Sequence, residues 1–192
     1  DLRNPLGIAT GYVEEARSSG TIDHLVIVEE ALARMRRLID ETLMLAKMGE
    51  TAIERHPASL HAVAERAWTQ VDTGNATLSV DGDGRLEADE SRLQELFENL
   101  FRNAAEHVGD DVAVRVGVLP ERDGFFVEDD GPGISEHDRE QVFEVGYTTR
   151  SAGTGFGLRI VQEICEAHGW SVRVTEGSDG GARFEFGGVD VR

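Results

Sequence analysis

The chain has 192 residues, of which 19 are Lys or Arg and 37 are Asp or Glu, so its formal net charge is −18 at pH 7. This excess of acid excludes a surface built for nucleic acid, because phosphate contacts need clustered Lys and Arg. No apolar run approaches the roughly 18 residues of a membrane span. A lone Cys165 forms no intramolecular disulfide, which suits a reducing compartment. We expect a cytoplasmic chain without membrane contact of its own, and leave open whether a longer parent protein is membrane-anchored.

The basic residues are almost all arginine, since Lys47 is the single lysine. An acidic, arginine-based surface is typical of proteins that work in concentrated salt, so the composition suggests a haloarchaeal-like halophile. An ordinary acidic cytosolic protein is the alternative, because net charge governs solubility and association rather than fold.

Residues 1–50 have the periodicity of helices that pack on other helices. Ser18-Ser19-Gly20 separates two helix seams with spacings of three and four, namely Leu2, Leu6, Ala9, Val13 and Ala16, then Leu25, Val28, Leu32, Met35, Ile39, Thr42 and Ala46. This pattern predicts an antiparallel helical hairpin whose second helix covers about residues 22–48. Two helices alone cannot bury so wide a stripe, so we expect a homodimer through residues 1–50 that completes a four-helix bundle. The alternative is a hairpin that packs on the rest of its own chain.

From residue 51 onward the pattern predicts a mixed α/β domain that extends to residue 192. The expected helices cover residues 59–69, 89–107 and 158–168. The expected strands cover residues 77–80, 85–88, 112–119, 124–128, 171–175 and 182–186. Asp81-Gly82-Asp83-Gly84 indicates a hairpin turn between the first two of these strands. The expected fold class is α+β, a helical hairpin followed by an α/β sandwich.

The long predicted helix carries two amides and an imidazole on one face. Asn99, Asn103 and His107 are spaced four residues apart, and leucines occupy the opposite side. An amide offers its carbonyl oxygen to a hard cation and its NH2 group to a phosphate, so this face suits a metal-bound polyphosphate. The alternative is an exposed helix face with two incidental asparagines.

Two glycine-rich stretches follow. In the first, Asp129 to Ile134, an acid at the end of a strand can accept a hydrogen bond from an exocyclic amine while Gly131 and Gly133 let a ring lie against the backbone; a tight turn is the alternative. The second, Gly153 to Leu158, has three alternating glycines before a helix, which leaves backbone N–H groups free to converge on phosphate. It is neither a Walker loop nor the dinucleotide fingerprint, because it lacks their residues and spacing.

Together, the order and spacing of these stretches resemble the catalytic core of sensor histidine kinases over nearly the whole chain. Residues 99–107 match the N box of that family, residues 129–134 its first glycine box, residues 142–144 its F box and residues 153–158 its second glycine box. Residues 1–6 match the continuation of the H box, whose phospho-accepting histidine stands immediately before the acid. The resemblance implies a dimerisation and phosphotransfer hairpin over residues 1–50. It implies a Bergerat-type ATP-binding domain, as in gyrase and heat-shock chaperones, over residues 51–192.

The resemblance implies ATP and Mg2+ as cofactors, with Asp129 on the adenine amine, Asn103 on the magnesium ion and Asn99 on the phosphate side. His107 would flank the nucleotide, and residues 144–157 would form a lid. The implied catalytic residues are Asp1, which would help to activate the histidine, and Asn4, which would orient water for dephosphorylation. The implied ATP-binding residues are Asn99, Asn103, His107, Asp129, Gly131, Gly133, Ile134, Thr148, Thr149, Gly153, Thr154, Gly155, Phe156, Gly157 and Leu158.

The implied enzyme is an ATP-dependent protein-histidine kinase. It would transfer the γ-phosphoryl group from Mg-ATP to a histidine just upstream of Asp1, and the group would then pass to an aspartate of a response-regulator receiver domain. Because the chain starts with Asp1 rather than Met, we expect a fragment that lacks the acceptor histidine and cannot phosphorylate itself.

Two other functions remain open. A hydrolytic, clamp-type ATPase of the same fold places a glutamate four residues before the metal-binding Asn, where this chain has Asn99; Glu98 is one residue off and points about 100° away around the helix. A nucleotide-binding dimeric scaffold without kinase activity would also contain the hairpin.

Three positions depart from the family pattern: Glu106 replaces a frequent basic residue, Asp130 replaces a frequent Asn, and Ala182 replaces a residue that frequently carries a hydroxyl.

Overall fold

The computed structural model describes residues 3–19, 24–29, 31–32, 35, 39, 53–82, 84–108, 111–120, 123–148 and 155–192. The chain divides into two compact units, one of residues 1–50 with 148–154 and one of residues 51–147 with 155–192. Among the helices of the described ranges, none combines the length and the apolar character that crossing a membrane requires.

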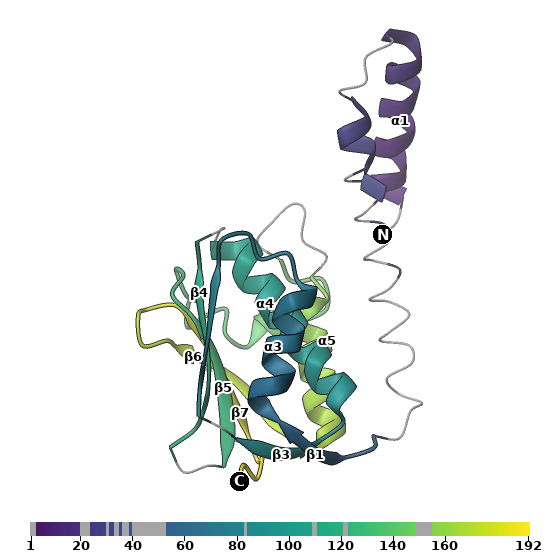
Figure 1. Cartoon of the computed structure of the whole chain (residues 1–192). Coiled ribbons are helices and arrows are strands. Elements are labelled where there is room, and N and C mark those ends of the chain that lie inside the picture. Colours follow the sequence, from purple (N-terminus) through teal and green to yellow (C-terminus); the bar gives the residue numbers. More distant parts are fainter. Residues whose placement is uncertain are drawn as a thin grey trace. The chain divides into compact units, whose positions relative to one another are not determined.

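The first unit contains helix α1 (Arg3–Ser19) and helical residues at 24–29, 31–32, 35 and 39 (Figure 1). Ala9 of α1 is buried with Val28 and Ala31, and Tyr12 and Met35 lie against this small cluster. Other apolar residues of both segments are exposed within the single chain: Leu6, Ile8, Val13, Leu25, Val26, Leu32 and Ile39. Most of the predicted helix over 22–48, and the link between the two helices, lie outside the described residues.

The second unit is built on a five-stranded sheet with the order β2-β4-β5-β7-β6. Its strands are β2 (Thr77–Asp81), β4 (Ala113–Val118), β5 (Gly124–Asp129), β6 (Ser171–Glu176) and β7 (Ala182–Gly187). β2 runs parallel to β4, and the other neighbouring pairs are antiparallel. A separate antiparallel pair consists of β1 (His56–Ser59) and β3 (Arg85–Ala88).

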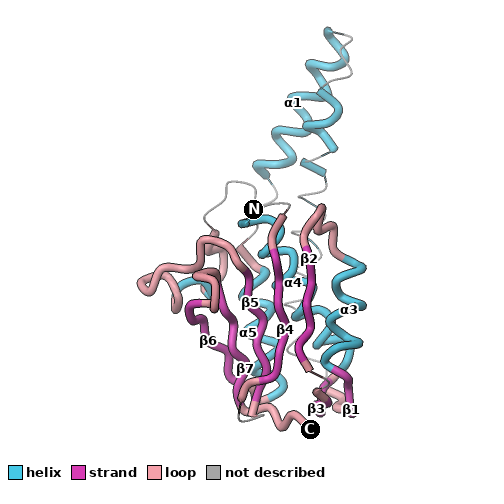
Figure 2. Tube along the Cα trace, turned by 60° about the vertical axis from the view of Figure 1, so that its left-hand side comes forward, coloured by secondary structure: helices cyan, strands magenta, loops and turns pink. Residues whose placement is uncertain are grey.

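Helices α3 (Leu60–Gln70), α4 (Glu90–Val108) and α5 (Gly157–His168) lie on one face of the five-stranded sheet, and the other face carries no helix among the described residues (Figures 1 and 2). The short 3-10 helix η1 (Gln141–Phe143) precedes α5. Local capping sets the helix ends: the Ser59 hydroxyl accepts from Ala62 N at 3.2 Å, and Asp89 Oδ1 accepts from Arg92 N at 3.2 Å. Gly169 ends α5 in the left-handed conformation.

The core lies between these helices and the sheet and is rich in phenylalanine. Phe125 of β5 stacks on Phe186 of β7 with ring centroids 4.5 Å apart, and Phe97 of α4 lies 5.9 Å from Phe125. Phe97, Phe125 and Phe186 are fully buried, so each adds about 1.5–3 kcal/mol of burial free energy. The aromatic contacts fix α4 against β5, the two elements that carry Asn99, Asn103 and Asp129.

The predicted mixed α/β fold is confirmed, and two details are wrong or missing. The expected hairpin between residues 77–80 and 85–88 does not form, because β2 pairs in parallel with β4 while β3 pairs with β1. Gly84 is packed too tightly for a solvent-exposed turn, since a Cβ atom there would lie 2.7 Å from Val191 Cγ1. β1 was not predicted, because four residues that include Pro57 give no alternation to detect.

Candidate nucleotide-binding site

Asp129, the last residue of β5, is held by backbone donors. Its Oδ1 accepts hydrogen bonds from Gly131 N at 2.9 Å and from Ala182 N at 3.1 Å. Burial raises the pKa of the Asp129 carboxyl above its usual value, although these two hydrogen bonds and the nearby His107 oppose the rise. Both hydrogen bonds end on Oδ1, which leaves Oδ2 without a hydrogen-bond donor among the described residues.

Glycines surround this carboxylate because backbone comes too close for side chains. A Cβ atom on Gly181 would lie 1.8 Å from the Asp129 carbonyl oxygen, and one on Gly131 would lie 2.2 Å from Val108 Cγ2. Gly133 has a φ of +72°, and a Cβ atom there would lie 2.8 Å from the Gly180 carbonyl oxygen. The first glycine stretch, the end of α4 and the β6–β7 turn therefore meet at Asp129.

Asn99 and Asn103 project from α4 toward the start of α5. Asn99 is only 5% exposed, and its Nδ2 donates to the Glu95 carbonyl oxygen at 2.9 Å. A Cβ atom on Gly157 would lie 3.4 Å from Asn99 Oδ1 and 3.4 Å from Asn103 Oδ1. The predicted common face of the two amides is thus brought into contact with the second glycine stretch.

The first turn of α5 has no side-chain cap, since Phe156 at the N-cap makes no capping hydrogen bond. Its early N–H groups are a favourable place for an anion beside the two amides. Gly155 has a φ of +73°, and its carbonyl oxygen accepts from Gly146 N at 3.0 Å. Leu158, in the first turn, is half-buried.

Two basic side chains on α4 flank this region. His107 is exposed near the end of the helix, and in its protonated form it lowers the pKa of Asp129. Arg102 Nη1 lies 3.5 Å from Asn99 Oδ1, and no carboxylate pairs with Arg102 within the described part of the chain. Asn99 Oδ1 is therefore a shared neighbour of Gly157 and of an arginine.

The remaining predicted site residues are scattered or outside the described part. Ile134 is half-buried and its carbonyl oxygen accepts from Arg139 Nε at 3.2 Å; Asn4 is exposed on α1, and Thr148 is exposed. The other members of the predicted set, Asp1, Thr149, Gly153 and Thr154, lie outside the described residues.

The structure gives Ala182 and Asp130 backbone contacts that the sequence pattern did not indicate. Ala182 serves the site through its backbone N–H, although its side chain lacks a hydroxyl. Asp130 Oδ1 accepts from Ala113 N on β4 at 2.9 Å, and the negative charge of Asp130 contributes to the raised pKa of Asp129. Burial raises the pKa of the Cys165 thiol to about 12, so this buried free cysteine is an unreactive part of the core.

A comparison with protein families matches residues 88–191 to the histidine kinase-, DNA gyrase B-, and HSP90-like ATPases. This segment includes α4, both glycine stretches, Asp129 and the β6–β7 turn, which are the elements that form the candidate site. The chain belongs to this family of ATPases.

The curated relatives include a regulatory histidine kinase and several sensor histidine kinases, which confirms the resemblance. The methanogenesis regulatory histidine kinase FilI of Methanothrix harundinacea is 32% identical over 88% of this chain and 21% of its own length. The sensor histidine kinase ZraS of Escherichia coli O157:H7 is 31% identical over 96% of this chain and 43% of its own length. The chain thus spans less than half the length of these relatives.

Solved structures of histidine kinases share the fold. Acinetobacter baumannii AdeS has a TM-score of 0.76 at 17% identity, covering 96% of this chain and 94% of that one. Histidine kinase ThkA in complex with the response regulator protein TrrA has a TM-score of 0.76 at 22% identity, covering 98% of this chain and 58% of that one. ShkA in complex with AMPPNP has a TM-score of 0.68 at 23% identity, covering 93% and 40%.

Proposed function

We propose that residues 51–192 bind Mg-ATP with the adenine against Asp129. The carboxylate has one oxygen fixed by Gly131 N and Ala182 N, so its second oxygen is available to accept from the adenine amine. Gly131 and Gly133 let the base approach the backbone. This doubly anchored, half-buried carboxylate is the observation that carries the proposal.

The phosphates belong at the junction of α4 and α5. Asn103 would hold the magnesium ion through its amide oxygen, and Asn99 would face the phosphate side. The N–H groups of the first turn of α5, together with residues 148–154, would contact the phosphates. Magnesium would supply charge neutralisation for the polyphosphate, which matters in a chain with a net charge of −18.

The reaction that we propose is phosphoryl transfer to a histidine just upstream of Asp1 and then to a receiver-domain aspartate. The ThkA complex with a response regulator is the neighbour that supports this partner class. Residues 1–50 would form the dimerisation hairpin, supported by the exposed Leu6, Leu25 and Leu32, which a second copy would cover. The protein would act in the cytoplasm.

Hydrolysis by a clamp-type ATPase is the rival, and the glutamates of α4 disfavour it. Glu98 Oε1 accepts from Gln94 Nε2 at 2.8 Å, and Glu95 Oε2 accepts from Arg92 Nη1 at 3.2 Å. Both carboxylates are thus engaged by side chains one turn back along the helix. Glu98 points about 100° away from Asn99 around the helix, and Glu95, although it lies on the face of Asn99 and Asn103, is one turn before Asn99 and pairs with Arg92. Neither is placed to activate a water beside the phosphates.

Calorimetric titration with ADP and ATP, with and without Mg2+, tests the nucleotide site. Asp129→Asn should weaken ADP binding by about 10-fold or more, because the amide presents donors to the adenine amine. Asp130→Asn is the matched control one residue along, since its carboxylate binds Ala113 N instead. Unchanged ADP affinity in Asp129→Asn would overturn the assignment of the adenine site.

Incubation with γ-labelled Mg-ATP tests the reaction. The chain as given should gain no acid-labile label, and a chain extended upstream through the acceptor histidine should gain it and pass it to a receiver domain. Rapid release of inorganic phosphate without label would favour the hydrolytic rival.

Light scattering tests the homodimer, which molar salt should stabilise because like-charged protomers repel at low salt.

A further inference from the structure

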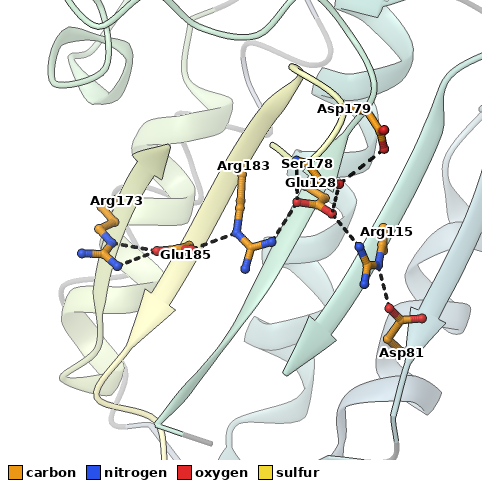
Figure 3. A network of polar contacts seen from close by, with 8 residues as sticks. All are labelled: Asp81, Arg115, Glu128, Arg173, Ser178, Asp179, Arg183 and Glu185. Carbon is orange, nitrogen blue, oxygen red and sulfur yellow. Dashed lines mark hydrogen bonds and ion pairs between the residues drawn. The ribbon is translucent and has the colours of Figure 1, made fainter. Parts of the chain in front are cut away.

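The face of the sheet opposite the helices carries a continuous line of ion pairs across all five strands (Figure 3). The line is built by cross-strand neighbours, since Glu128 lies opposite Arg115 on one side and Arg183 on the other, and Arg173 lies opposite Glu185. Two further contacts complete it, from Arg115 to Asp81 and from Arg183 to Glu185.

Glu128 is the most buried member, with 4% of its side chain exposed. Its Oε2 accepts from Arg183 Nη1 at 2.8 Å, and its Oε1 accepts from Arg115 Nη1 at 3.1 Å. Ser178, in the β6–β7 turn, donates its hydroxyl to Glu128 Oε1 at 3.0 Å and its backbone N–H to Oε2 at 3.4 Å. Burial opposes the charge of Glu128, yet the Arg183 and Ser178 hydrogen bonds hold the pKa of Glu128 below its usual value.

The turn that Ser178 occupies is the same turn that closes over Asp129. Gly177 N donates to the Gly181 carbonyl oxygen at 2.7 Å, which ties the two ends of the turn together. Gly181 lies directly on the Asp129 backbone, and the next residue, Ala182, donates to Asp129 Oδ1. Glu128 precedes Asp129 in β5 and points to the opposite face of the sheet. The end of β5 therefore contacts the 177–181 turn twice. The Glu128 side chain binds the turn on one face of the sheet, and Asp129 packs against it on the other.

We infer that Glu128 and Ser178 form a positioning pair for base recognition. They hold the 177–181 turn so that Ala182 N fixes the orientation of the Asp129 carboxylate toward the adenine amine. Glu128 and Ser178 touch no substrate in this scheme, and they act through Ala182 on the selectivity for adenine over other purines. The inference rests on the proposed nucleotide function of Asp129.

The experiment measures base selectivity by calorimetric titration of the chain with ADP and with inosine diphosphate, whose base carries a carbonyl where adenine carries an amine. The wild-type chain should prefer ADP. Ser178→Ala removes one hydrogen bond from an exposed residue without leaving a buried cavity, and it should lower the ratio of ADP to inosine diphosphate affinity by about 3- to 10-fold. Ser178→Thr, which keeps the hydroxyl, should restore the ratio. The ratio of ATP to ADP affinity, which reports on the phosphate side, should stay within about 2-fold of wild type.

Glu185→Gln is the matched control for Glu128→Gln. Both substitutions remove a carboxylate from the line of ion pairs, but Glu185 accepts from Arg173 and Arg183 rather than from the 177–181 turn. Only Glu128→Gln should lower the base selectivity, whereas both should reduce the free energy of unfolding in urea. Full base selectivity in folded Ser178→Ala and Glu128→Gln would overturn the inference while leaving the nucleotide site intact. Absence of ADP binding by the wild-type chain would instead overturn the proposed function, and the inference with it.

Discussion

The Arg183 guanidinium carbon lies 3.7 Å from the centroid of the Phe126 ring, and the same guanidinium donates to Glu128 and Glu185. Arg115 lies over the same ring at 5.5 Å. Phe126 points to the face of the sheet without helices, yet it is only 5% exposed, because arginine side chains cover it. An apolar ring is thus buried by charged residues on an otherwise polar surface.

Arg183→Ala should lower the free energy of unfolding by about 2–3 kcal/mol, because it uncovers Phe126 and removes a partner from the buried Glu128. This loss of stability is smaller than the loss expected when an isolated buried ion pair loses one partner, since Arg115 and Ser178 still contact Glu128. Arg173→Ala is the control: its side chain is 74% exposed, and its loss should change stability by less than about 1 kcal/mol. Equal urea midpoints for the two variants would contradict the assignment.

His168 predicts a decline in stability on mild acidification. Asp89 N donates to His168 Nε2 at 3.0 Å, so the ring is neutral with its proton on Nδ1, which lies 2.8 Å from the Ile164 carbonyl oxygen. Burial lowers the pKa of His168 below 6.5, so the unfolded chain takes up a proton first as the pH falls. The contribution of neutral His168 to the free energy of unfolding is therefore fully present above about pH 6.5 and decreases as the pH falls below this value.

His168→Gln should flatten the pH dependence of the unfolding free energy between pH 6.5 and 5, although the variant is less stable throughout. His56→Gln, at an exposed position on β1, should retain the wild-type slope. Urea titrations at several pH values give both slopes. Identical slopes for wild type and His168→Gln would exclude the buried imidazole as the source.

Asp129 predicts a pH dependence of nucleotide binding. Only the carboxylate accepts freely from an amine, and burial raises the pKa of Asp129, so ADP affinity should fall with decreasing pH through that raised value. Asp129→Asn should bind weakly with no such dependence. Calorimetric titrations from pH 7 downward, within the pH range where the chain stays folded, measure this dependence of ADP affinity on pH. A wild-type ADP affinity that does not change with pH would argue against a carboxylate that binds the adenine base.

Gly181 and Gly169 form a matched pair of glycines, one beside Asp129 and one at the end of α5. Gly181→Ala should displace the Asp129 backbone, because its Cβ atom would lie 1.8 Å from the carbonyl oxygen. Gly169→Ala meets no atom within 4 Å but carries a φ of +70°, so it should lower stability by about 1–2 kcal/mol and leave ADP affinity unchanged. Only Gly181→Ala should weaken ADP binding, by at least about 10-fold.

Arg102 predicts discrimination by phosphate number. Its guanidinium neighbours Asn99 Oδ1 and has no acidic partner among the described residues, so we expect it to neutralise phosphate charge. Arg102→Ala should weaken ATP binding by about 10-fold and AMP binding by less than about 2-fold. Arg92→Ala, which removes an arginine that pairs with Glu95, should change neither.

The sequence predicted those parts of the site that depend on local pattern. The spacing of Asn99 and Asn103 indicated a shared helix face, and α4 places both beside Gly157. The acid at the end of β5 was identified in the same way, because a strand followed by Gly-x-Gly is a local signal.

The parts that long-range pairing decides could not be predicted. Asp81-Gly82-Asp83-Gly84 is a good hairpin signal, but the partner of β2 is β4 and that of β3 is β1. Glu128, Arg115 and Arg183 come from three strands, and only the register of the sheet brings them opposite one another. The Gly180-Gly181 pair before β7 was the one available sign that backbone must approach closely there.

The hydrogen bond from Gly146 N to the Gly155 carbonyl oxygen has a consequence for how this domain tolerates change. A Cβ atom on Gly155 would lie 2.5 Å from the Gly146 carbonyl carbon, so the two chain ends that flank residues 147–154 are already in contact. The free energy cost of closing a loop between Gly146 and Gly155 rises only slowly with the length of the loop, by about 0.6 kcal/mol per doubling. Insertions, deletions or grafted sequences between these two glycines should therefore leave the sheet and helices unaltered. Residues 147–154 are thus a suitable position for exchanging loop sequences between related kinases.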